Sequence, residues 1–350
     1  VVGAFGRHTG ALTHGNDGIP TGDWYGFLYR SMALLFNLVI CLVGAGMFAK
    51  TTFFILLGVM ISLCSSFASF FIKKKQIFTE IPAENTLFGN QTPHLLYTGF
   101  NWTTLRGNLW VERTEDYQTH TDPTILVIFG VLFNGVTGIM AGANMSGDLK
   151  NPAKSIPRGT LEASFFTFLI YLLLVFFASA TCTRPLLVNQ YNFLQVINVV
   201  PALTTVGVFL ATLSASLSCL IGASRILQAV ANDSLLGSCI TYFGRGFGRN
   251  NEPVFAVLIS WLLVQGVIFV HKVNTLAPIV SMFFLLSYGV TNLACFVLKV
   301  SSAPNFRPTF PYYSKGTALL GMLSCFAIMF AVNVIYASLS VAIMVILFLV

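Results

Sequence analysis

Two glycines and two polar side chains lie together near the middle of one long apolar run. Within residues 124–145, Gly135 and Gly138 are three positions apart, and Asn134 and Thr137 each precede one of them. Glycine in a membrane helix often serves only close packing between helices. An amide, a hydroxyl and two glycines within five residues favour an interruption of the helix. We therefore expect regular helical hydrogen bonding to lapse near residues 134–138.

An interrupted helix would supply ligands for ions of both signs. Backbone N–H groups at the start of the second half-helix, together with the positive end of its dipole, attract an anion. The freed carbonyls and the Thr137 hydroxyl can coordinate a cation. Transporters tolerate unwound backbone within the membrane where it lines a cavity. This stretch therefore predicts an ion-binding site.

A second group of oxygen-bearing side chains lies in the run at 200–230. Thr212, Ser214, Ser216 and Ser218 alternate with apolar residues. Helical geometry puts Ser214 and Ser218 on one face, with Ala211 one turn before Ser214. Two interpretations stay open: the hydroxyls bond back to their own helix, or they are oxygen ligands for a small cation.

Acidic residues and enzyme motifs are absent where catalysis or proton coupling would need them. None of the twelve Asp and Glu residues lies near the middle of an apolar run, whereas proton-coupled carriers usually keep a carboxylate or His there. There is no G-x-S-x-G, H-E-x-x-H or P-loop motif. The seven cysteines form no C-x-x-C pair and resemble small core residues. We expect no enzyme, no metal site and no cofactor.

The composition is that of a membrane protein. Of 350 residues, 55% are hydrophobic and 9% are charged, against roughly 25% charged in soluble domains. The net charge of +7 comes from basic residues between apolar runs, not along a stripe, which argues against nucleic-acid binding. Nine apolar runs are long enough, or nearly so, to cross a bilayer core of about 30 Å. They are 25–46, 52–72, 124–145, 162–181, 200–230, 253–271, 277–299, 316–333 and 335–350.

The distribution of charge predicts the orientation. The loops after the third, fifth and seventh runs carry nine basic residues, whereas the two loops between them carry two. The loops after the third, fifth and seventh runs should therefore be cytoplasmic. The segment at 73–123 then lies outside, and it contains N-x-T sequons at Asn90 and Asn101. We expect at least one to be glycosylated. Three consecutive lysines at 73–75 disagree with this orientation.

Three stretches carry a resemblance to a known family. Residues 134–160 resemble the sixth helix of the cation-chloride cotransporters, solute carrier family 12; residues 211–216 resemble its eighth helix and residues 274–296 its tenth. Residues 98–101, 221–227 and 303–310 are most similar to its cotransporter-interacting-protein branch. The resemblance implies an all-α integral membrane protein with the inverted-repeat, five-plus-five fold of the amino acid-polyamine-cation superfamily.

On that alignment the chain is a truncated part of the family fold. It would begin at the end of the third helix and stop in the twelfth, and we would not expect it to transport alone. The implied parts are a remnant of the third helix and a loop at 1–24, helices four and five at 25–72, an extracellular loop at 73–123, the second inverted repeat at 124–299 with its sixth helix broken, and helices eleven and twelve at 300–350.

The resemblance also implies an anion site. Gly138, Ile139 and Met140 match the backbone that holds a chloride in the family, and Tyr288 matches the tyrosine that caps it.

For cations, the match to the family is incomplete. Thr137 matches a potassium-site hydroxyl, but Asn134 stands where that site usually has a proline. Ala211 and Ser214 match part of the sodium site of the sodium-coupled members, while Ala215 replaces a second serine. The first difference puts the identity of the cation in doubt, and the second argues against sodium.

The function implied is secondary-active symport of chloride with a monovalent cation, potassium rather than sodium, contributing to ion and cell-volume homeostasis. Two alternatives remain: a regulatory partner of related cotransporters that carries no ions, and a carrier of organic substrates such as amino acids or polyamines. The protein should lie in the plasma membrane, with the endolysosomal membrane as the alternative, as a homodimer or a hetero-oligomer with related cotransporters.

Overall fold

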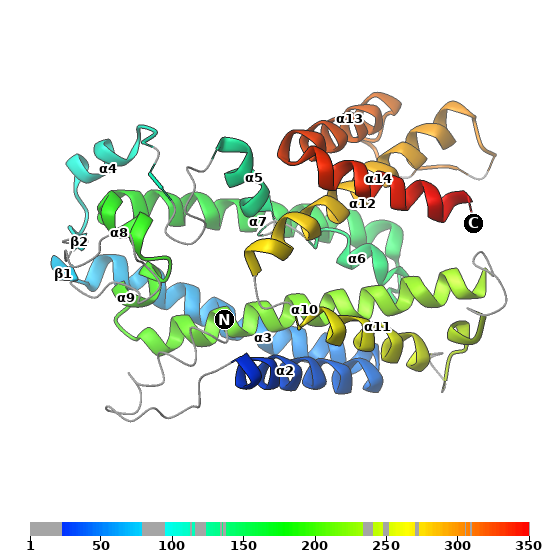
Figure 1. The fold of residues 1–350 in the computed structure, drawn as a ribbon, viewed down its shortest axis with the longest axis horizontal. Helices are drawn as coiled ribbons and strands as arrows, with labels where there is room; N and C mark the ends of the chain where they lie inside the picture. Colours follow the sequence, from blue (N-terminus) through cyan, green and yellow to red (C-terminus); the bar gives the residue numbers. More distant parts are fainter. Residues whose placement is uncertain are drawn as a thin grey trace. The chain divides into compact units, whose positions relative to one another are not determined.

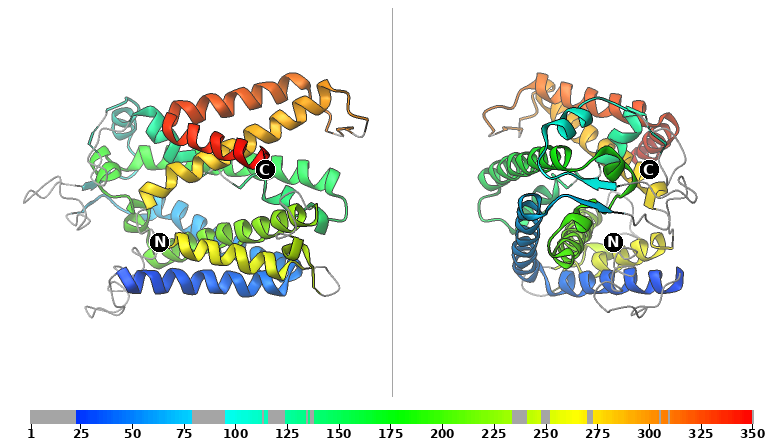
Figure 2. Two further views of the ribbon diagram at one scale, coloured as in Figure 1. Left: turned by 45° about the vertical axis from the view of Figure 1, so that its right-hand side comes forward. Right: turned by 90° about the vertical axis from the view of Figure 1, so that its left-hand side faces the viewer.

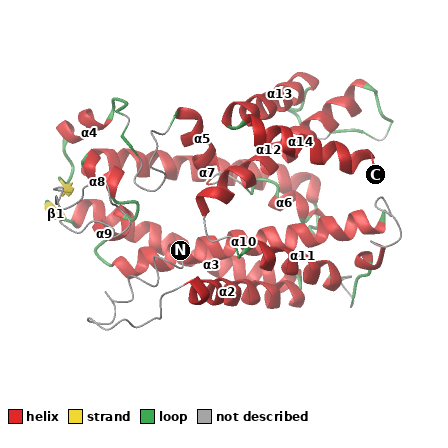
Figure 3. Cartoon of the chain, in the orientation of Figure 1, coloured by secondary structure: helices red, strands yellow, loops and turns green. Residues whose placement is uncertain are grey.

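The described part of the chain is mainly helical in the computed structural model (Figures 1 and 3). It divides into two compact units, the first formed by Val1–Asp122 with Leu161–Phe269 and the second by Pro123–Thr160 with Val270–Val350. The structure describes residues 23–78, 95–112, 114–115, 124–133, 135, 138–233, 241–247, 252–269, 273–304, 306–308 and 310–349.

The first unit is built around four helices that contact one another. They are α2 (Asp23–Val43), α3 (Ala45–Ile72), α10 (Pro201–Asn232) and α11 (Val254–Val267), and Figures 1 and 2 show them side by side. Helices α3 and α10 run antiparallel and approach closely at two glycines. A Cβ on Gly58 would lie 2.6 Å from Leu210 Cδ1, and one on Gly207 would overlap the Ser62 side chain. Small residues at these positions let the two backbones come together.

A single residue, Gly44, separates α2 from α3. Its φ of 105° lies in the region that favours glycine. Its amide still donates to Ile40 O, and its carbonyl accepts from Met47 and Phe48. The first predicted run, 25–46, therefore ends earlier than expected, and α3 starts seven residues before the predicted start at 52.

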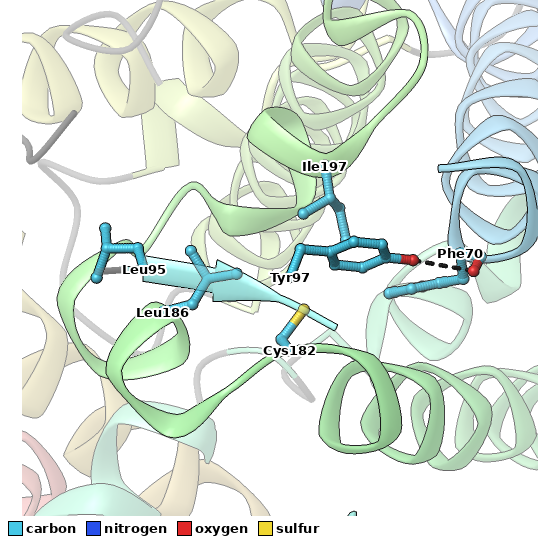
Figure 4. Close-up of a cluster of buried hydrophobic side chains, with 6 residues drawn as sticks. All are labelled: Phe70, Leu95, Tyr97, Cys182, Leu186 and Ile197. Carbon is cyan, nitrogen blue, oxygen red and sulfur yellow. Dashed lines mark hydrogen bonds between the residues drawn. The ribbon is translucent and has the colours of Figure 1, made fainter. Parts of the chain in front are cut away.

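Short elements at the other end of α3 form a separate small core. Strand β1 (Gln76–Phe78) pairs antiparallel with β2 (Leu95–Tyr97), and α4 (Trp102–Asn108), α8 (Arg184–Asn189) and α9 (Phe193–Ile197) lie in the same unit. Figure 4 shows its buried side chains. The Tyr97 hydroxyl donates to Phe70 O over 2.9 Å. Burial raises the pKa of Tyr97 to about 12 and that of the Cys182 thiol to about 11, so both stay protonated at neutral pH.

In the second unit, three longer helices pack together with the half-helix α5 (Ile125–Phe133), which contacts the first two of them. They are α12 (Val273–Val300), α13 (Lys315–Val332) and α14 (Val334–Leu349), and their core includes Met282, Leu285 and Met329, with Phe133 packed against it. Only Asn333 separates α13 from α14, and its side-chain oxygen accepts from the amide of Tyr336. The short helices α6 (Ala141–Asn144) and η2 (Ser146–Asp148) follow α5 in the chain.

Each of the nine predicted runs corresponds to helix in the described residues. Within the part of the chain that the structure describes, six helices are long and apolar enough to cross a membrane, and α11 and α14 are shorter apolar helices. The largest difference in boundaries is α7 (Pro152–Thr181), which begins ten residues before the predicted start at 162. The Asn151 carbonyl accepts hydrogen bonds from the backbone amides of Lys154 and Ser155. The polar residues before the apolar run therefore already form the first turns of the helix. Residues 1–22, which include most of the predicted third-helix remnant, lie outside the described residues.

Candidate ion-binding sites

The third apolar run is interrupted where the glycine cluster predicts it. Helix α5 ends at Phe133, and α6 begins at Ala141. Between them Gly138 has a φ of 99°, which an L-residue with a side chain rarely adopts. The Ala141 amide donates to Gly138 O over 2.9 Å. Asn134 and Thr137 themselves lie outside the described residues.

The backbone after the interruption is accessible. Gly138 and Ile139 are exposed, and a Cβ on Gly138 would meet nothing within 4 Å. The described residues provide no hydrogen-bond acceptor for the amides of Gly138, Ile139 and Met140. However, α6 is a single turn of four residues. The expected attraction from the dipole of a half-helix is therefore small, and an anion here would be bound by the N–H groups themselves.

Tyr288 lies beside the beginning of the interruption. Its ring centroid is 6.4 Å from that of Phe133, the last residue of α5, and 6.1 Å from that of Phe284 on α12. Its hydroxyl oxygen is buried. One turn later, the side-chain nitrogen Nδ2 of Asn292 donates to the backbone oxygen of Tyr288 over 2.8 Å. Tyr288 therefore lies next to the C-terminal end of α5.

A buried hydroxyl fixes α5 to α12. Ser281 is fully buried, and its Oγ donates to Gly130 O over 3.0 Å. A Cβ on Gly130 would lie 3.0 Å from Val332 Cγ1 of α13, so the absence of a side chain here allows a close approach between α5 and α13. The half-helix α5 thus contacts both α12 and α13. Sequence reasoning missed Ser281, although a serine within a predicted span was a visible signal.

The second candidate segment, on α10, stays helical throughout. The Thr212 hydroxyl donates to Val208 O and the Ser216 hydroxyl to Leu213 O, both over 3.0 Å, so these two bond back to their own helix. The Ser214 hydroxyl has no hydrogen bond to a described residue, and its side chain is half-buried. The two sequence interpretations therefore apply to different residues: Thr212 and Ser216 bond back to their own helix, whereas the Ser214 and Ser218 hydroxyls have no hydrogen bond to a described residue.

The residues matched to the cation sites are divided between the two units. Ala211, which is exposed, and Ser214 belong to the first unit, whereas Asn134 and Thr137 belong to the second. Sequence reasoning did not single out Asn37, a lone amide in the run at 25–46. Its Nδ2 donates to Ser216 Oγ.

Of the two sequons, only Asn101 is among the described residues. It is exposed and caps α4: its Oδ1 accepts from the amide and the hydroxyl of Thr103, over 2.9 and 2.7 Å. Asn90 lies outside the described residues.

Several apolar helices of membrane-spanning length are those of a multi-pass membrane protein. The family model for amino acid permeases matches residues 16–350, and the chain belongs to this family, with its all-helical superfamily fold.

Several relatives belong to solute carrier family 12. The chain is 44% identical over 345 residues to solute carrier family 12 member 9 of Danio rerio, covering 97% of this chain and 38% of that protein. It is 44% identical over 319 residues to the member 9 of Homo sapiens, covering 90% and 34%. To the human member 3 it is 34% identical over 267 residues, covering 64% and 26%. These relatives confirm the predicted resemblance, and the chain spans little more than a third of the length of the member 9 proteins.

Proposed function

We propose that the complete protein is a secondary-active symporter of chloride with a monovalent cation, potassium rather than sodium. The observation that carries this proposal is the interrupted helix: an exposed backbone at Gly138 follows a half-helix whose last side chain, Phe133, contacts Tyr288. Similarity to solute carrier family 12 members supports a cotransporter role.

The proposed anion site uses the amides of Gly138, Ile139 and Met140 and the hydroxyl of Tyr288. Amide and phenol groups are donors, and hydrogen bonds to a charged acceptor are stronger than those between neutral groups. A buried hydroxyl at the edge of an apolar cluster suits an anion that has lost part of its water. Chloride, a spherical anion without protons, needs only donors of this kind.

The proposed cation ligands form two separate sets, the oxygens of Asn134 and Thr137 in the second unit, and those of Ala211 and Ser214 on α10 in the first. The preference for potassium rests on the α10 segment. Ala215 brings only a methyl group, and the nearby Ser216 hydroxyl already donates to Leu213 O and accepts from Asn37. A compact sodium ion left short of oxygen ligands would be poorly compensated for its lost hydration. In this scheme the transported ions would contribute to ion and cell-volume homeostasis.

A second candidate function is supported by the same shortage of oxygens on α10. A protein that binds related cotransporters and regulates them, without carrying ions, would not need a complete cation site. The flux assay below separates the two functions, since a regulatory partner would co-purify with a related cotransporter and show no flux of its own.

The test is ion flux by the complete protein in vesicles or cells, with chloride and each cation replaced in turn. Symport predicts that cation uptake requires chloride and that chloride uptake requires potassium. Cation uptake that persists without chloride, or chloride uptake that persists without potassium, would contradict the proposal. Uptake of an added amino acid or polyamine would contradict it as well. The membrane that carries this flux, plasma or endolysosomal, can be read from the localisation of the same tagged protein.

The proposal places residues 73–123 outside the cell, so Asn101, and Asn90 in the same segment, should be glycosylated. The exposed Asn101 Nδ2 is the atom that receives the glycan. Glycosidase treatment should increase the mobility of the protein on a gel. Asn101→Gln should remove part of that shift, whereas Asn108→Gln, in the same segment but outside any sequon, should not. A band that does not shift in the wild type would contradict this orientation.

A further inference from the structure

The end of α7 is capped by a segment from another part of the chain. The last carbonyls of an α-helix have no partner within the helix. Here the carbonyls of residues 179–182 all accept hydrogen bonds from residues 98–108. The donors are the backbone amides of Thr98 and Asn101, over 2.8 and 3.0 Å, and the side-chain nitrogen of Asn108, which donates twice over 2.8 Å. Figure 1 shows α4, which lies within this segment, beside the end of α7.

A second set of bonds holds the residues that follow. Arg184, just beyond α7, donates from Nη2 to the carbonyls of Gly107 and Trp110, over 2.7 and 2.6 Å. Its Nη1 pairs with the Glu112 carboxylate. We call residues 98–112 the cap segment. Since bonds to residues 179–184 hold the cap segment at both ends, its position along the axis of α7 is fixed.

The cap segment lies where two apolar helices end together. The Tyr97 hydroxyl donates to Phe70 O near the end of α3, and both residues share a buried core with Cys182 beside the end of α7 (Figure 4). Three lysines at 73–75 follow α3 directly, and Arg184 is the first charged residue after α7. Long apolar helices that give way to charged residues at one level mark a boundary of the bilayer core.

Two tryptophans are exposed on the cap segment. Trp102, the first residue of α4, is 72% exposed, and Trp110 is 78% exposed. Trp102 directly follows Asn101, whose amide bonds to α7, and the Trp110 carbonyl bonds to Arg184. Neither indole can therefore move far from the level at which α7 ends. Large aromatic side chains are mostly buried on folding, so a pair that is exposed and tethered points to a partner outside the chain.

The apolar surface of α7 continues onto the cap segment. The ring centroid of Phe100 lies 5.8 Å from that of Phe176 and 6.2 Å from that of Phe177. Of the residues of α7, only Ala180 and Thr181 are buried, so the described chain leaves the apolar span of this helix for lipid to cover. Because Phe100 extends this surface to the cap segment, the lipid that covers α7 also reaches the exposed tryptophans.

We propose that the cap segment is an anchor at the membrane–water boundary, with the indoles of Trp102 and Trp110 among the headgroups and glycerol esters of a phospholipid bilayer. Tryptophan suits this region because its ring is apolar while its N–H can donate to an ester or phosphate oxygen. The hydrogen bonds of the cap segment then fix the depth of the end of α7. This is the helix by which the chain passes from the second unit into the first.

Two neighbouring features are compatible with the anchor. Lys74 and Lys75, two of the three lysines that conflict with the predicted orientation, are exposed at the same level, where their ammonium groups can meet lipid phosphates. A sugar on Asn101 can extend into water while Trp102 faces lipid, since consecutive side chains point in different directions. The anchor does not depend on which ions the protein carries.

The test is the depth of each tryptophan in the complete protein, labelled with fluorotryptophan and placed in a phosphatidylcholine bilayer. The fluorine NMR resonances are assigned by their loss in Trp102→Phe and Trp110→Phe. Both should lose most of their intensity to a nitroxide on the lipid headgroup, and much less to a nitroxide near the end of the acyl chain or to a water-soluble gadolinium chelate. Trp261, near the middle of α11 and with a buried Nε1, is the control and should keep its intensity with the headgroup nitroxide.

Any other order of the three reagents would overturn the anchor. Loss of intensity mainly to the chelate would place the tryptophans in water, and loss mainly to the chain-end nitroxide would place them deep in the bilayer. Protection from all three reagents would show that protein covers them, either a partner or another part of the complete protein.

Asn108→Ala tests whether the cap segment sets the depth. This change removes both hydrogen bonds from the Asn108 side chain to the end of α7, so the two resonances should lose intensity to the chelate as well as to the headgroup nitroxide. Asn189→Ala is the matched control, because Asn189 Nδ2 donates over 2.9 Å to the carbonyl of Pro185 within its own helix, α8. The control should keep the wild-type order of the reagents. If Asn108→Ala keeps that order too, the cap segment does not fix the depth of α7, and this part of the proposal is wrong.

Discussion

The interruption between α5 and α6 and the unbroken helix α10 present ion ligands in different ways. At the interruption, the amides of Gly138, Ile139 and Met140 are outside regular helix and point to no described acceptor. In α10, which is 32 residues long, backbone groups are used within the helix. An ion can then reach only side-chain oxygens and the second lone pairs of carbonyls. The site at the interruption therefore depends on a residue that tolerates positive φ. A site on α10 depends on how the neighbouring helices orient α10.

The largest effect should come from removing the only side-chain donor proposed at the interruption. Tyr288→Phe deletes a hydrogen bond to a charged partner, worth about 1.5–3 kcal/mol. The affinity for chloride should fall about tenfold or more, measured as the KM of flux by the complete protein. Tyr313→Phe is the control, because its hydroxyl donates to Cys295 O in the same unit, over 2.7 Å. Equal chloride dependence in wild type and Tyr288→Phe would remove the tyrosine from the site.

A side chain at the glycine contact of α10 should act on stability first. Gly207→Ala places a methyl group where the Ser62 side chain lies, and such overpacking costs about 1–3 kcal/mol. The melting temperature should fall. Ser62→Gly, made in the same protein, should recover much of the loss by clearing the space. A fall that Ser62→Gly leaves untouched would show that the two helices are held together elsewhere.

Two glycines of the interrupted segment should respond differently to the same added methyl group. Neither Gly138 nor Gly142 has an atom within 4 Å of its ideal Cβ, but only Gly138 has a positive φ. Gly138→Ala should therefore cost about 1–2 kcal/mol of local strain and weaken chloride dependence. Gly142→Ala, within α6, should be neutral or slightly stabilising. Identical chloride titrations for the two variants would mean that the backbone at 138 is not a ligand.

The smallest expected effect is the change in flux when sodium is removed. Replacing external sodium with a large organic cation should leave flux unchanged, because the α10 segment lacks the second serine and the Ser216 hydroxyl is already engaged. The positive control is removal of potassium in the same preparation. Flux that disappears with sodium would show that other oxygens complete a sodium site on this helix.

The sequence was sufficient for features that follow from composition and from glycine chemistry. Runs of apolar residues predicted the helices, and two glycines with a neighbouring amide and hydroxyl predicted the interruption, because both signals are local. The short strands at residues 76–78 and 95–97 were missed, since three residues carry no measurable periodicity. Asn37 and Ser281 were also missed. Their importance comes from partners far along the chain, Ser216 and Gly130, which no single-sequence pattern identifies.

The link between α2 and α3 has a consequence for tolerance to mutation. A Cβ on Gly44 would lie 2.6 Å from Glu252 Oε1, and the other oxygen of that carboxylate is 3.2 Å from Arg225 Nη2. A side chain at residue 44 would therefore have to adopt an unfavourable positive φ and displace the end of the Glu252 side chain, which pairs with Arg225 on α10. The tolerance of this linker to substitution should therefore depend on how far the Glu252 carboxylate can move without leaving Arg225.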